Sequence, residues 1–142
     1  MTTAQTVFFQ QPVTYVYTMQ IKQPELAFSP ENKLKRALQA VCTAFSLNPE
    51  ILRTDKSRRR EIVIGRQSVW KIVKEDYPFI KLRELAKFFG NFDHTTVIHG
   101  IGAITDSMLT DPGLKERFFF ALKLYNESEN MERNISNDNY IE

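Results

Sequence analysis

Four consecutive residues, Asp93, His94, Thr95 and Thr96, carry side-chain groups that can read the edges of DNA bases. A carboxylate accepts a hydrogen bond from the amino group of cytosine, threonine offers a methyl group to thymine and a hydroxyl to phosphate, and histidine donates or accepts. Taken alone, this tetrad has a simpler explanation, because Asp followed by hydroxyl residues is common where a helix begins. The elements on either side of it favour the DNA-reading interpretation.

The tetrad lies between two stretches with helical spacing. The stretch before it has apolar residues at i, i+3, i+4 and i+7, namely Leu82, Leu85, Ala86 and Phe89. Gly90-Asn91 then supplies the residues most tolerant of a left-handed backbone, which predicts a tight turn. After the tetrad an apolar face is formed by Val97, Ile101, Ile104 and Met108, with Gly100 and Gly102 permitting close helix approach. Two helices joined by a short glycine turn predict a helix-turn-helix, whose second helix presents its first residues to the base edges.

A run of cations precedes this motif. Six basic residues against Asp55 and Glu61 fall within one short stretch: Arg53, Lys56, Arg58, Arg59, Arg60 and Arg66. Such a run is often a solvated surface or a targeting patch. This one lies in a loop that leads into a helix, where arginines can reach phosphates or a narrow minor groove. Residues 29–125 hold 17 lysines and arginines against 11 acids, so the small net charge of +2 conceals a basic body and an acidic tail.

Enzyme machinery is absent from the sequence. It contains no glycine-rich phosphate loop, and His94 and His99 are five residues apart, about 140° around a helix. Ser57, Ser68 and Cys42 have no nucleophile-elbow context. We therefore expect no catalytic activity, no metal or cofactor and no small-molecule substrate. The single cysteine, Cys42, is expected to be a buried small hydrophobe.

The rest of the chain predicts a mainly α fold. Ser29-Pro30-Glu31 starts a helix from Pro30 to about Phe45, and Asn48-Pro49-Glu50 starts a short helical turn. A further helix is expected from about Glu61 to Asp76. Asp111-Pro112 starts a closing helix with a face made by Leu114, Phe118, Ala121, Leu122 and Tyr125. Because this helix is apolar nearly all round, we expect it to be covered on more than one side.

Three segments are predicted in all. Residues 1–28 form an extended segment, because Val13 to Ile21 alternates like a strand. This segment either packs across the helical body, pairs with a second copy, or stays mobile until a partner arrives. Residues 29–126 form a helical DNA-binding domain, and residues 127–142 an acidic tail that we expect to be disordered. The longest apolar run, Phe118 to Leu122, is too short to span a bilayer, so a cytoplasmic, nucleoid-associated protein is expected.

The segment Gly90-Asn91-Phe92-Asp93-His94-Thr95-Thr96-Val97-Ile98-His99-Gly100 resembles the signature of the C-terminal DNA-binding domain, domain IV, of the bacterial replication initiator DnaA. The resemblance extends from about Ser29 to Asn126. It includes the arginine-rich loop, Arg66-Gln67 and Lys74-Glu75 in the following helix, and Asp111-Pro112. It implies a multi-helix bundle with a helix-turn-helix related to the Trp repressor.

The resemblance also implies roles for individual residues. Asp93, His94 and Thr95 correspond to base contacts in the major groove. Contacts to the phosphate backbone correspond to Arg66, Gln67, Lys74, Leu82, Arg83, Thr96 and His99. The basic loop corresponds to the part of the family that contacts the minor groove, and it consists of Lys56, Arg58, Arg59 and Arg60. Within the loop Arg58 aligns with the arginine that the family inserts, and Arg59 or Arg60 takes its place if the loop is shifted.

The sequence departs from the family pattern at several positions. Phe92 stands where the family usually has arginine, Asn91 where it has a second glycine, and Gly100 where it has alanine; one extra residue precedes Leu82. The 28 residues before the first helix cannot hold an ATPase module, so we expect a stand-alone relative of the domain.

The expected function is sequence-selective binding of double-stranded DNA in replication initiation, its control, or transcription. The alternative is a protein-interaction or oligomerisation module that kept the fold without specific DNA binding. It would associate through Phe119, Phe120 and Leu124 or through the Val13 to Ile21 segment. RNA binding is less favoured, because single-strand modules expose stacking aromatics on a sheet.

Overall fold

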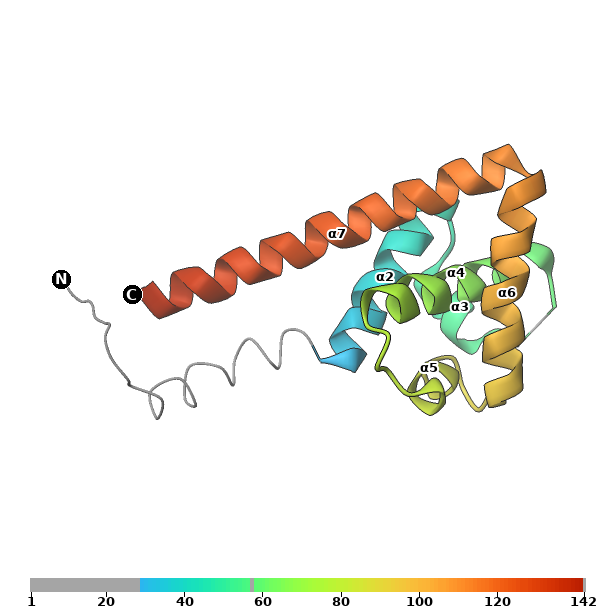
Figure 1. Cartoon of the computed structure of the whole chain (residues 1–142), viewed down its shortest axis with the longest axis horizontal. Coiled ribbons are helices and arrows are strands. Elements are labelled where there is room, and N and C mark those ends of the chain that lie inside the picture. Colours follow the sequence, from blue (N-terminus) through green and yellow to red (C-terminus); the bar gives the residue numbers. More distant parts are fainter. Residues whose placement is uncertain (1–28, 57, 142) are drawn as a thin grey trace.

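The structure, a computed structural model, describes residues 29–56 and 58–141, with side chains described as far as Ile135. The predicted extended segment 1–28 lies outside the described residues. Those residues form helices and no strand, which confirms the mainly α prediction (Figure 1). The helices are α2 (Pro30–Phe45), α3 (Pro49–Thr54), α4 (Arg60–Asp76), α5 (Leu82–Phe88), α6 (His94–Thr110) and α7 (Pro112–Ile141).

Local capping chemistry fixes the first two helices. The Ser29 hydroxyl accepts a hydrogen bond from the backbone N–H of Asn32 at 3.3 Å, and Pro30 occupies the first helical position. The Asn48 side chain accepts from the backbone N–H of Glu50 at 2.8 Å, just before α3 begins. Helix α2 ends at Ser46, whose φ of 57° lies in the left-handed region. The predicted bounds of α2 are confirmed.

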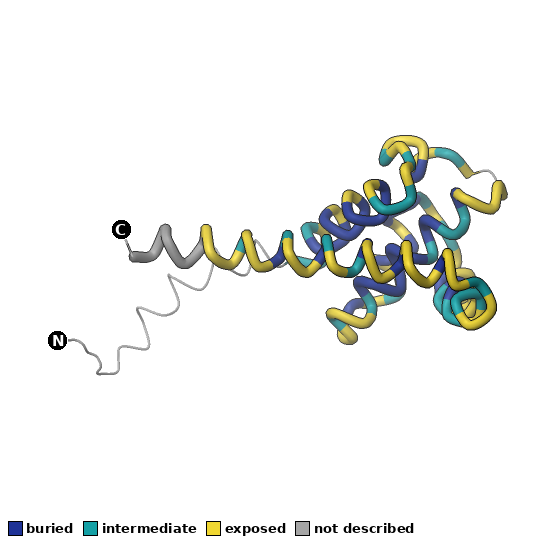
Figure 2. The backbone as a smooth tube through the Cα atoms, turned by 90° about the horizontal axis from the view of Figure 1, so that it is seen from above, coloured by how far each residue is buried: buried dark blue, intermediate teal, exposed yellow. Residues whose placement is uncertain are grey.

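Helix α4 is the central element of the bundle. It packs against both α2 and α6, and Figure 2 shows dark blue buried residues concentrated in the helical body. Val69, Ile72 and Val73 are inaccessible to solvent, and Trp70 is 2% exposed. Burying an aliphatic side chain of this size stabilises the fold by about 1.5–3 kcal/mol. The body of the domain is therefore assembled around this helix.

Helix α7 is much longer than the sequence predicted. The prediction ended the helical domain at residue 126 and made residues 127–142 a disordered tail, whereas the helix continues to Ile141. The reason lies in two acids on the face turned toward α2. Glu129 pairs with Lys33 at 3.2 Å, and Glu132 pairs with Arg36 at 2.7 Å. These ion pairs hold an acidic segment as a helix against a basic partner.

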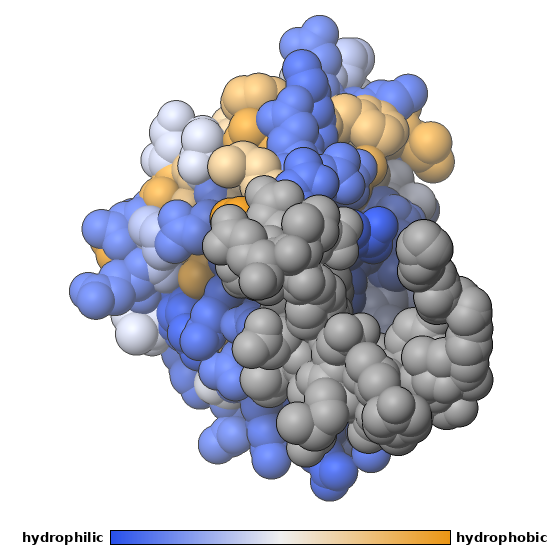
Figure 3. Space-filling view, turned by 90° about the vertical axis from the view of Figure 1, so that its left-hand side faces the viewer, coloured by the Kyte–Doolittle hydropathy of each residue, from blue (hydrophilic) through white to orange (hydrophobic). Residues whose placement is uncertain are grey.

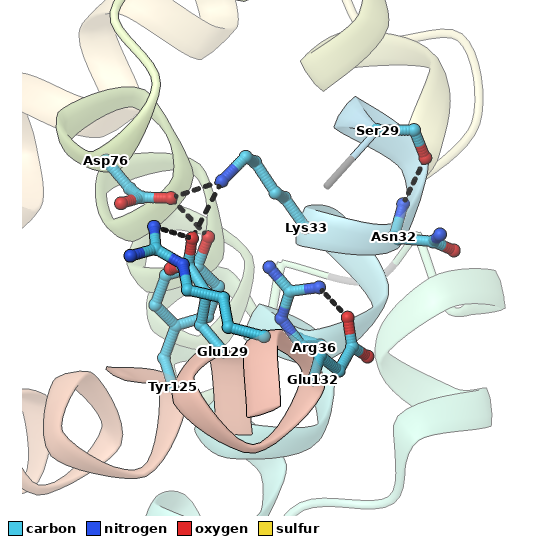
Figure 4. Close-up of polar contacts among 9 residues, drawn as sticks. Ser29, Asn32, Lys33, Arg36, Asp76, Tyr125, Glu129 and Glu132 are labelled. Carbon is cyan, nitrogen blue, oxygen red and sulfur yellow. Dashed lines mark hydrogen bonds and ion pairs between the residues drawn. The ribbon is translucent and has the colours of Figure 1, made fainter. Parts of the chain in front are cut away.

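A cluster of polar side chains, of which Lys33, Arg36 and Glu129 are buried, joins α2, α4 and α7 (Figure 4). Lys33 donates to Asp76 at 2.8 Å, and the hydroxyl of Tyr125 donates to the same carboxylate oxygen at 2.7 Å. Partial burial of Asp76 would raise its pKa, but these two hydrogen bonds and the charges of Lys33 and Arg36 leave the pKa below its ordinary value. Burial and the Asp76 carboxylate raise the pKa of Tyr125. Asp76 is thus held as a carboxylate.

Only one side of α7 is covered by the body. Leu114, Phe118, Ala121 and Tyr125 are buried, while Phe119 and Phe120 are 50% and 49% exposed. Figure 3 shows apolar surface gathered toward the top of one face, beside polar side chains. The expectation that this helix is covered on more than one side is not met by the described residues. None of the described helices combines the length and the apolar character needed to cross a bilayer.

Cys42 is 4% exposed, as expected of a small buried hydrophobe. Burial raises the pKa of its thiol to about 11, so the thiolate that reacts with oxidants and metals is disfavoured. The side chain therefore fills space in α2.

Candidate nucleic-acid interface

Helices α5 and α6 form the predicted helix-turn-helix. Gly90 in the turn has a φ of 96°, a conformation that a side chain would strain, and the backbone N–H of Phe92 donates to the Gly90 carbonyl at 2.7 Å. The sequence offered both Gly90 and Asn91 for the left-handed backbone. Only Gly90 adopts it, so Asn91 is not required for its conformational freedom.

Trp70 of α4 positions both helices of the motif. Its indole N–H donates to the backbone carbonyl of Leu85 in α5 at 2.9 Å. A Cβ added to Gly100 in α6 would lie 3.0 Å from the Trp70 ring, closer than side chains normally approach. The predicted role of Gly100 in close helix approach is confirmed, whereas a Cβ at Gly102 would meet no atom within 4 Å.

The tetrad Asp93 to Thr96 is exposed at the start of α6. Asp93 is the N-cap residue by its backbone, with φ −79° and ψ 150°, and its carbonyl accepts from the N–H of Val97 at 3.2 Å. Its carboxylate makes no capping hydrogen bond, so the expected side-chain cap is not formed. All four side chains are exposed, and Val97 is the first buried residue of the helix. The tetrad is left facing outward, as a contact with DNA bases would require.

A groove of about 640 Å³ lies between the basic loop and α6. It is lined by cationic, polar and apolar side chains from four parts of the chain: Lys56, Arg58, Val63, Arg66, Gln67, Trp70, Asn91, Phe92, Thr96, His99, Gly100 and Ala103. Arg58, Gln67 and His99 come from separate segments of the sequence and meet on this one face. The groove thus combines three cations with hydrogen-bonding groups suited to a phosphate backbone.

Two of the residues that the resemblance assigns to phosphate contact make hydrogen bonds within the protein. Arg66 is 5% exposed, and its guanidinium donates to the Asp55 carbonyl at 2.7 Å. Burial lowers the pKa of Arg66 below its usual value, and the charge of Asp55 acts in the opposite direction. The ammonium of Lys74 donates to the carbonyls of Pro78 and Ile80 at 2.8 and 3.1 Å. Both side chains fix the loops beside the motif.

The three consecutive arginines of the loop lie in different surroundings. Arg58 lines the groove, whereas Arg59 pairs with Asp55 at 3.3 Å. Arg60 lies beside a second, smaller pocket that includes Arg117 of α7. The sequence left open which arginine faces the helix-turn-helix. Of these three arginines, Arg58 is the one that lines the groove as the structure describes it.

The remaining assigned residues lie at the start of α5, where Leu82 is partly buried and Arg83 is exposed. No role was predicted for Phe92, although this residue lines the groove. Its ring centroid is 5.7 Å from that of Trp70, in an edge-on arrangement. The sequence feature that could have pointed to Phe92 is its position, an aromatic residue between the predicted turn and the polar tetrad. Within the described residues no cluster of three or more His, Cys, Asp or Glu could hold a metal ion.

Comparison with known proteins identifies the family to which this chain belongs. The family described as bacterial dnaA protein helix-turn-helix matches residues 34–104, which run from α2 into α6. The chain is 30% identical to the chromosomal replication initiator protein DnaA of Thermomicrobium roseum over 107 residues, 74% of this chain and 23% of that protein. It is 31% identical to DnaA of Bacteroides fragilis over 105 residues, 70% of this chain and 20% of the relative.

A third relative, DnaA of Bacteroides thetaiotaomicron, is 35% identical over 74 residues, 52% of this chain and 15% of that protein. No solved structure gives a significant match. The chain therefore spans about a fifth of the length of the relatives that it matches. The matched family is a DNA-binding fold, and its match covers the helices that build the groove and the exposed tetrad. The chain belongs to the family of bacterial DnaA helix-turn-helix domains.

Proposed function

We propose that this chain binds double-stranded DNA in a sequence-selective way, without catalysis or cofactor. The start of α6 would enter the major groove with Asp93, His94 and Thr95 toward the bases, while Arg58 would enter the adjacent minor groove. The observation that carries the proposal is the meeting of an exposed polar tetrad and a cationic groove on one face. The helix begins with polar side chains, and the Asp93 carboxylate is not used in a capping hydrogen bond. Arginines outnumber acids in the loop beside it. These groups are suited to hydrogen bonding with base edges.

Phosphate contacts should make the affinity depend on salt. Arg58, Arg83 and Lys56 supply exposed cations, and Gln67, Thr96 and His99 supply hydrogen-bonding groups. If roughly six phosphates are neutralised, the slope of log affinity against log salt should be about −5. A slope near zero would contradict a phosphate-bound complex.

Fluorescence anisotropy tests the selectivity directly. The unaltered protein is titrated into three labelled probes: a duplex with the binding box of a bacterial DnaA relative, a scrambled duplex, and the separated strands. We expect tighter binding to one duplex than to the other two probes at the same salt concentration. Equal and weak binding to all three would refute selective recognition, and selection from a random pool of duplexes would then show whether another sequence is preferred.

We propose a role in replication initiation or its control, in line with the names of the relatives, or a role in transcription, which those names do not mention. Those proteins are chromosomal replication initiators of which this chain matches about a fifth, so the activity of a whole initiator is not transferred to it. We place the protein at the bacterial nucleoid, in the cytoplasm. Mapping its bound sites on the chromosome would separate an origin-bound protein from one bound at promoters.

Self-association is a second candidate activity, favoured by one observation on α7. Phe120, Leu124, Met131 and Ile135 fall within about 60° on one side of this helix, and their spacings of 4, 7 and 4 residues read the same in both directions. Phe120, Met131 and Ile135 are 49%, 63% and 57% exposed. Two copies of α7 running antiparallel would face Phe120 with Ile135 and Leu124 with Met131, a self-complementary arrangement.

Light scattering after size-exclusion chromatography tests this second candidate. We expect a dimer that dissociates on dilution and is lost in Phe120→Glu. The matched control, Phe79→Glu, changes an 85% exposed ring outside α7 and should leave the dimer intact. A monomer at all concentrations would refute self-association, and a dimer that ignores DNA would favour an interaction module over a DNA reader.

A further inference from the structure

We propose that Phe92 is a positioning residue that clamps the basic loop onto the turn of the helix-turn-helix, so that loop and recognition helix meet DNA in a fixed register. The proposal rests on the proposed function for its consequence, but the clamp itself can be tested without DNA. In the resemblance described above, Phe92 replaces a residue that the family usually has as arginine.

Two cations of different segments approach the Phe92 ring. The guanidinium carbon of Arg66 is 5.2 Å from the ring centroid, and the ammonium of Lys56 is 5.6 Å from it. Both distances lie within the range in which the electron-rich face of an aromatic ring attracts a cation. The Trp70 ring meets Phe92 edge-on at an interplanar angle of 80°, so the phenyl ring is itself held in place.

These contacts connect the loop to the turn by two routes. In the first route, Arg66 lies against the Phe92 ring and donates a hydrogen bond to the backbone carbonyl of Asp55. In the second, Lys56, which follows Asp55 in the chain, places its ammonium near the same ring. Independently, a Cβ built on Gly90 would lie 3.1 Å from both the Cε and the Nζ of Lys56. The Lys56 side chain therefore lies against the turn as well as against the ring. The start of the basic loop has little freedom to move away from the motif while Phe92 is in place.

The charge of the groove explains why an aromatic ring suits this position. Lys56, Arg58 and Arg66 all line the groove, and a fourth cation among them would be repelled before any phosphate arrived. A phenyl ring lets cations gather around it at no cost in like-charge repulsion. With a phenyl ring here, the groove has one fewer cation for phosphate than it would have with arginine, but Lys56, Arg58 and Arg66 are held in an ordered arrangement.

Limited proteolysis with trypsin tests the clamp in the absence of DNA. Trypsin cleaves after Lys56, Arg58 and Arg59, and mass spectrometry identifies each cut. We expect Phe92→Ala to raise the initial rate of these cuts several-fold. Phe92→Tyr keeps the ring and should match the unaltered protein, and Phe92→Leu keeps apolar volume without an aromatic face and should fall between. Phe79→Ala, which removes an 85% exposed ring that does not line the groove, is the matched control and should change nothing in the loop.

A double-mutant cycle with Arg58→Ala tests the consequence for DNA. If the clamp holds Arg58 toward the duplex, Arg58→Ala should weaken selective binding about tenfold in the unaltered protein and clearly less in Phe92→Ala. Thermal unfolding by circular dichroism checks that each variant is folded at the temperature of the titration. Independent, multiplicative effects of the two substitutions would overturn the positioning role.

The two experiments separate failure of the clamp from failure of the proposed function. Unchanged tryptic cuts in folded Phe92→Ala, with selective DNA binding intact, would overturn the clamp alone. Faster cuts in a chain that binds no duplex selectively would support the clamp and overturn the DNA-reading proposal. Faster cuts together with non-additive DNA binding would support both.

Discussion

Helix α4 carries a charged cluster near each of its ends, and the two clusters are built on different principles. Near its C-terminus, Asp76, Glu129 and Glu132 are matched by Lys33 and Arg36, with Tyr125 hydrogen-bonded among them. Near its N-terminus, Lys56, Arg58 and Arg66 gather in a groove that is lined by no acid among the described residues, and the backbone carbonyl of Asp55 accepts a hydrogen bond from Arg66.

The difference separates a charge arrangement that serves the fold from one that serves a partner. Matched and desolvated charges lose stability when one member is removed, because the others remain buried without compensation. An excess of partly exposed cations adds little to folding and attracts an anion from outside. The comparison therefore predicts stability defects at one end of α4 and binding defects at the other.

The largest effect is expected at the matched cluster. Lys33→Met leaves Asp76 and Glu129 facing each other without their shared cation, and should lower the free energy of unfolding by about 3 kcal/mol in a denaturant titration. The control is Lys35→Met on the same helix, whose side chain is 56% exposed and pairs weakly with Glu31 at 3.5 Å. It should change stability by less than about 0.5 kcal/mol. Equal effects of the two variants would remove the distinction.

At the other end of α4 the expected defects are in binding. Arg58→Ala and Thr95→Ala should each weaken the preferred duplex by about 1–3 kcal/mol while leaving the unfolding midpoint nearly unchanged. Arg58→Ala should also reduce the salt slope, because it removes a charge. Lys115→Ala on α7, away from the groove, serves as the control. Unchanged discrimination between duplexes in Thr95→Ala would exclude this side chain from base reading.

Two glycines of α6 provide an internal comparison on the DNA-binding side. Alanine is favoured over glycine by about 1 kcal/mol inside a helix, and Gly102→Ala should gain most of this in thermal unfolding since no atom lies nearby. Gly100→Ala would place its Cβ 3.0 Å from the buried Trp70 ring, so the gain should be cancelled or reversed. Equal stabilisation of the two variants would mean that α6 can move away from α4 freely.

The smallest effect concerns acid unfolding. Because the folded-state pKa of Asp76 lies below its ordinary value, this carboxylate contributes stability above the unfolded-state pKa and loses it as the pH falls through the folded-state pKa. Tyr125→Phe removes a hydrogen bond that lowers this pKa, so stability should be lost at a higher pH, with a change of about 1 kcal/mol at neutral pH. Far-ultraviolet circular dichroism from pH 7 downward measures the shift. An acid limb that does not move would contradict the role assigned to Tyr125.

Features encoded within a few residues could be predicted from the sequence. The caps at Ser29 and Asn48, the turn at Gly90 and the close approach at Gly100 depend on local residue types, and the structure contains all four. The length of α7 could not be predicted, because Glu129 and Glu132 find their partners 96 residues earlier in the chain. An acidic run without knowledge of those partners reads as a solvated tail.

The candidate site shows the same limit. The tetrad and the basic loop were found from residue type and spacing, and Arg58, Gln67, Thr96 and His99 do meet in one groove. Arg66 and Lys74 turn inward because backbone carbonyls of neighbouring loops accept their protons, and no periodic pattern specifies the path of a loop. A positioning role for Phe92 could not be predicted for a related reason, because it depends on two cations that the fold brings to the ring.

The single tryptophan of the chain has a practical consequence. Trp70 touches α5 through its N–H and α6 through its ring, and it lines the groove beside Phe92. Its emission therefore reports on the seam between the two motif helices, without any label and without a second indole to confuse the signal. A shift in that emission when a duplex is added would indicate that the packing around Trp70 changes on binding. A constant spectrum would indicate that this part of the protein stays rigid and that the DNA adapts to it.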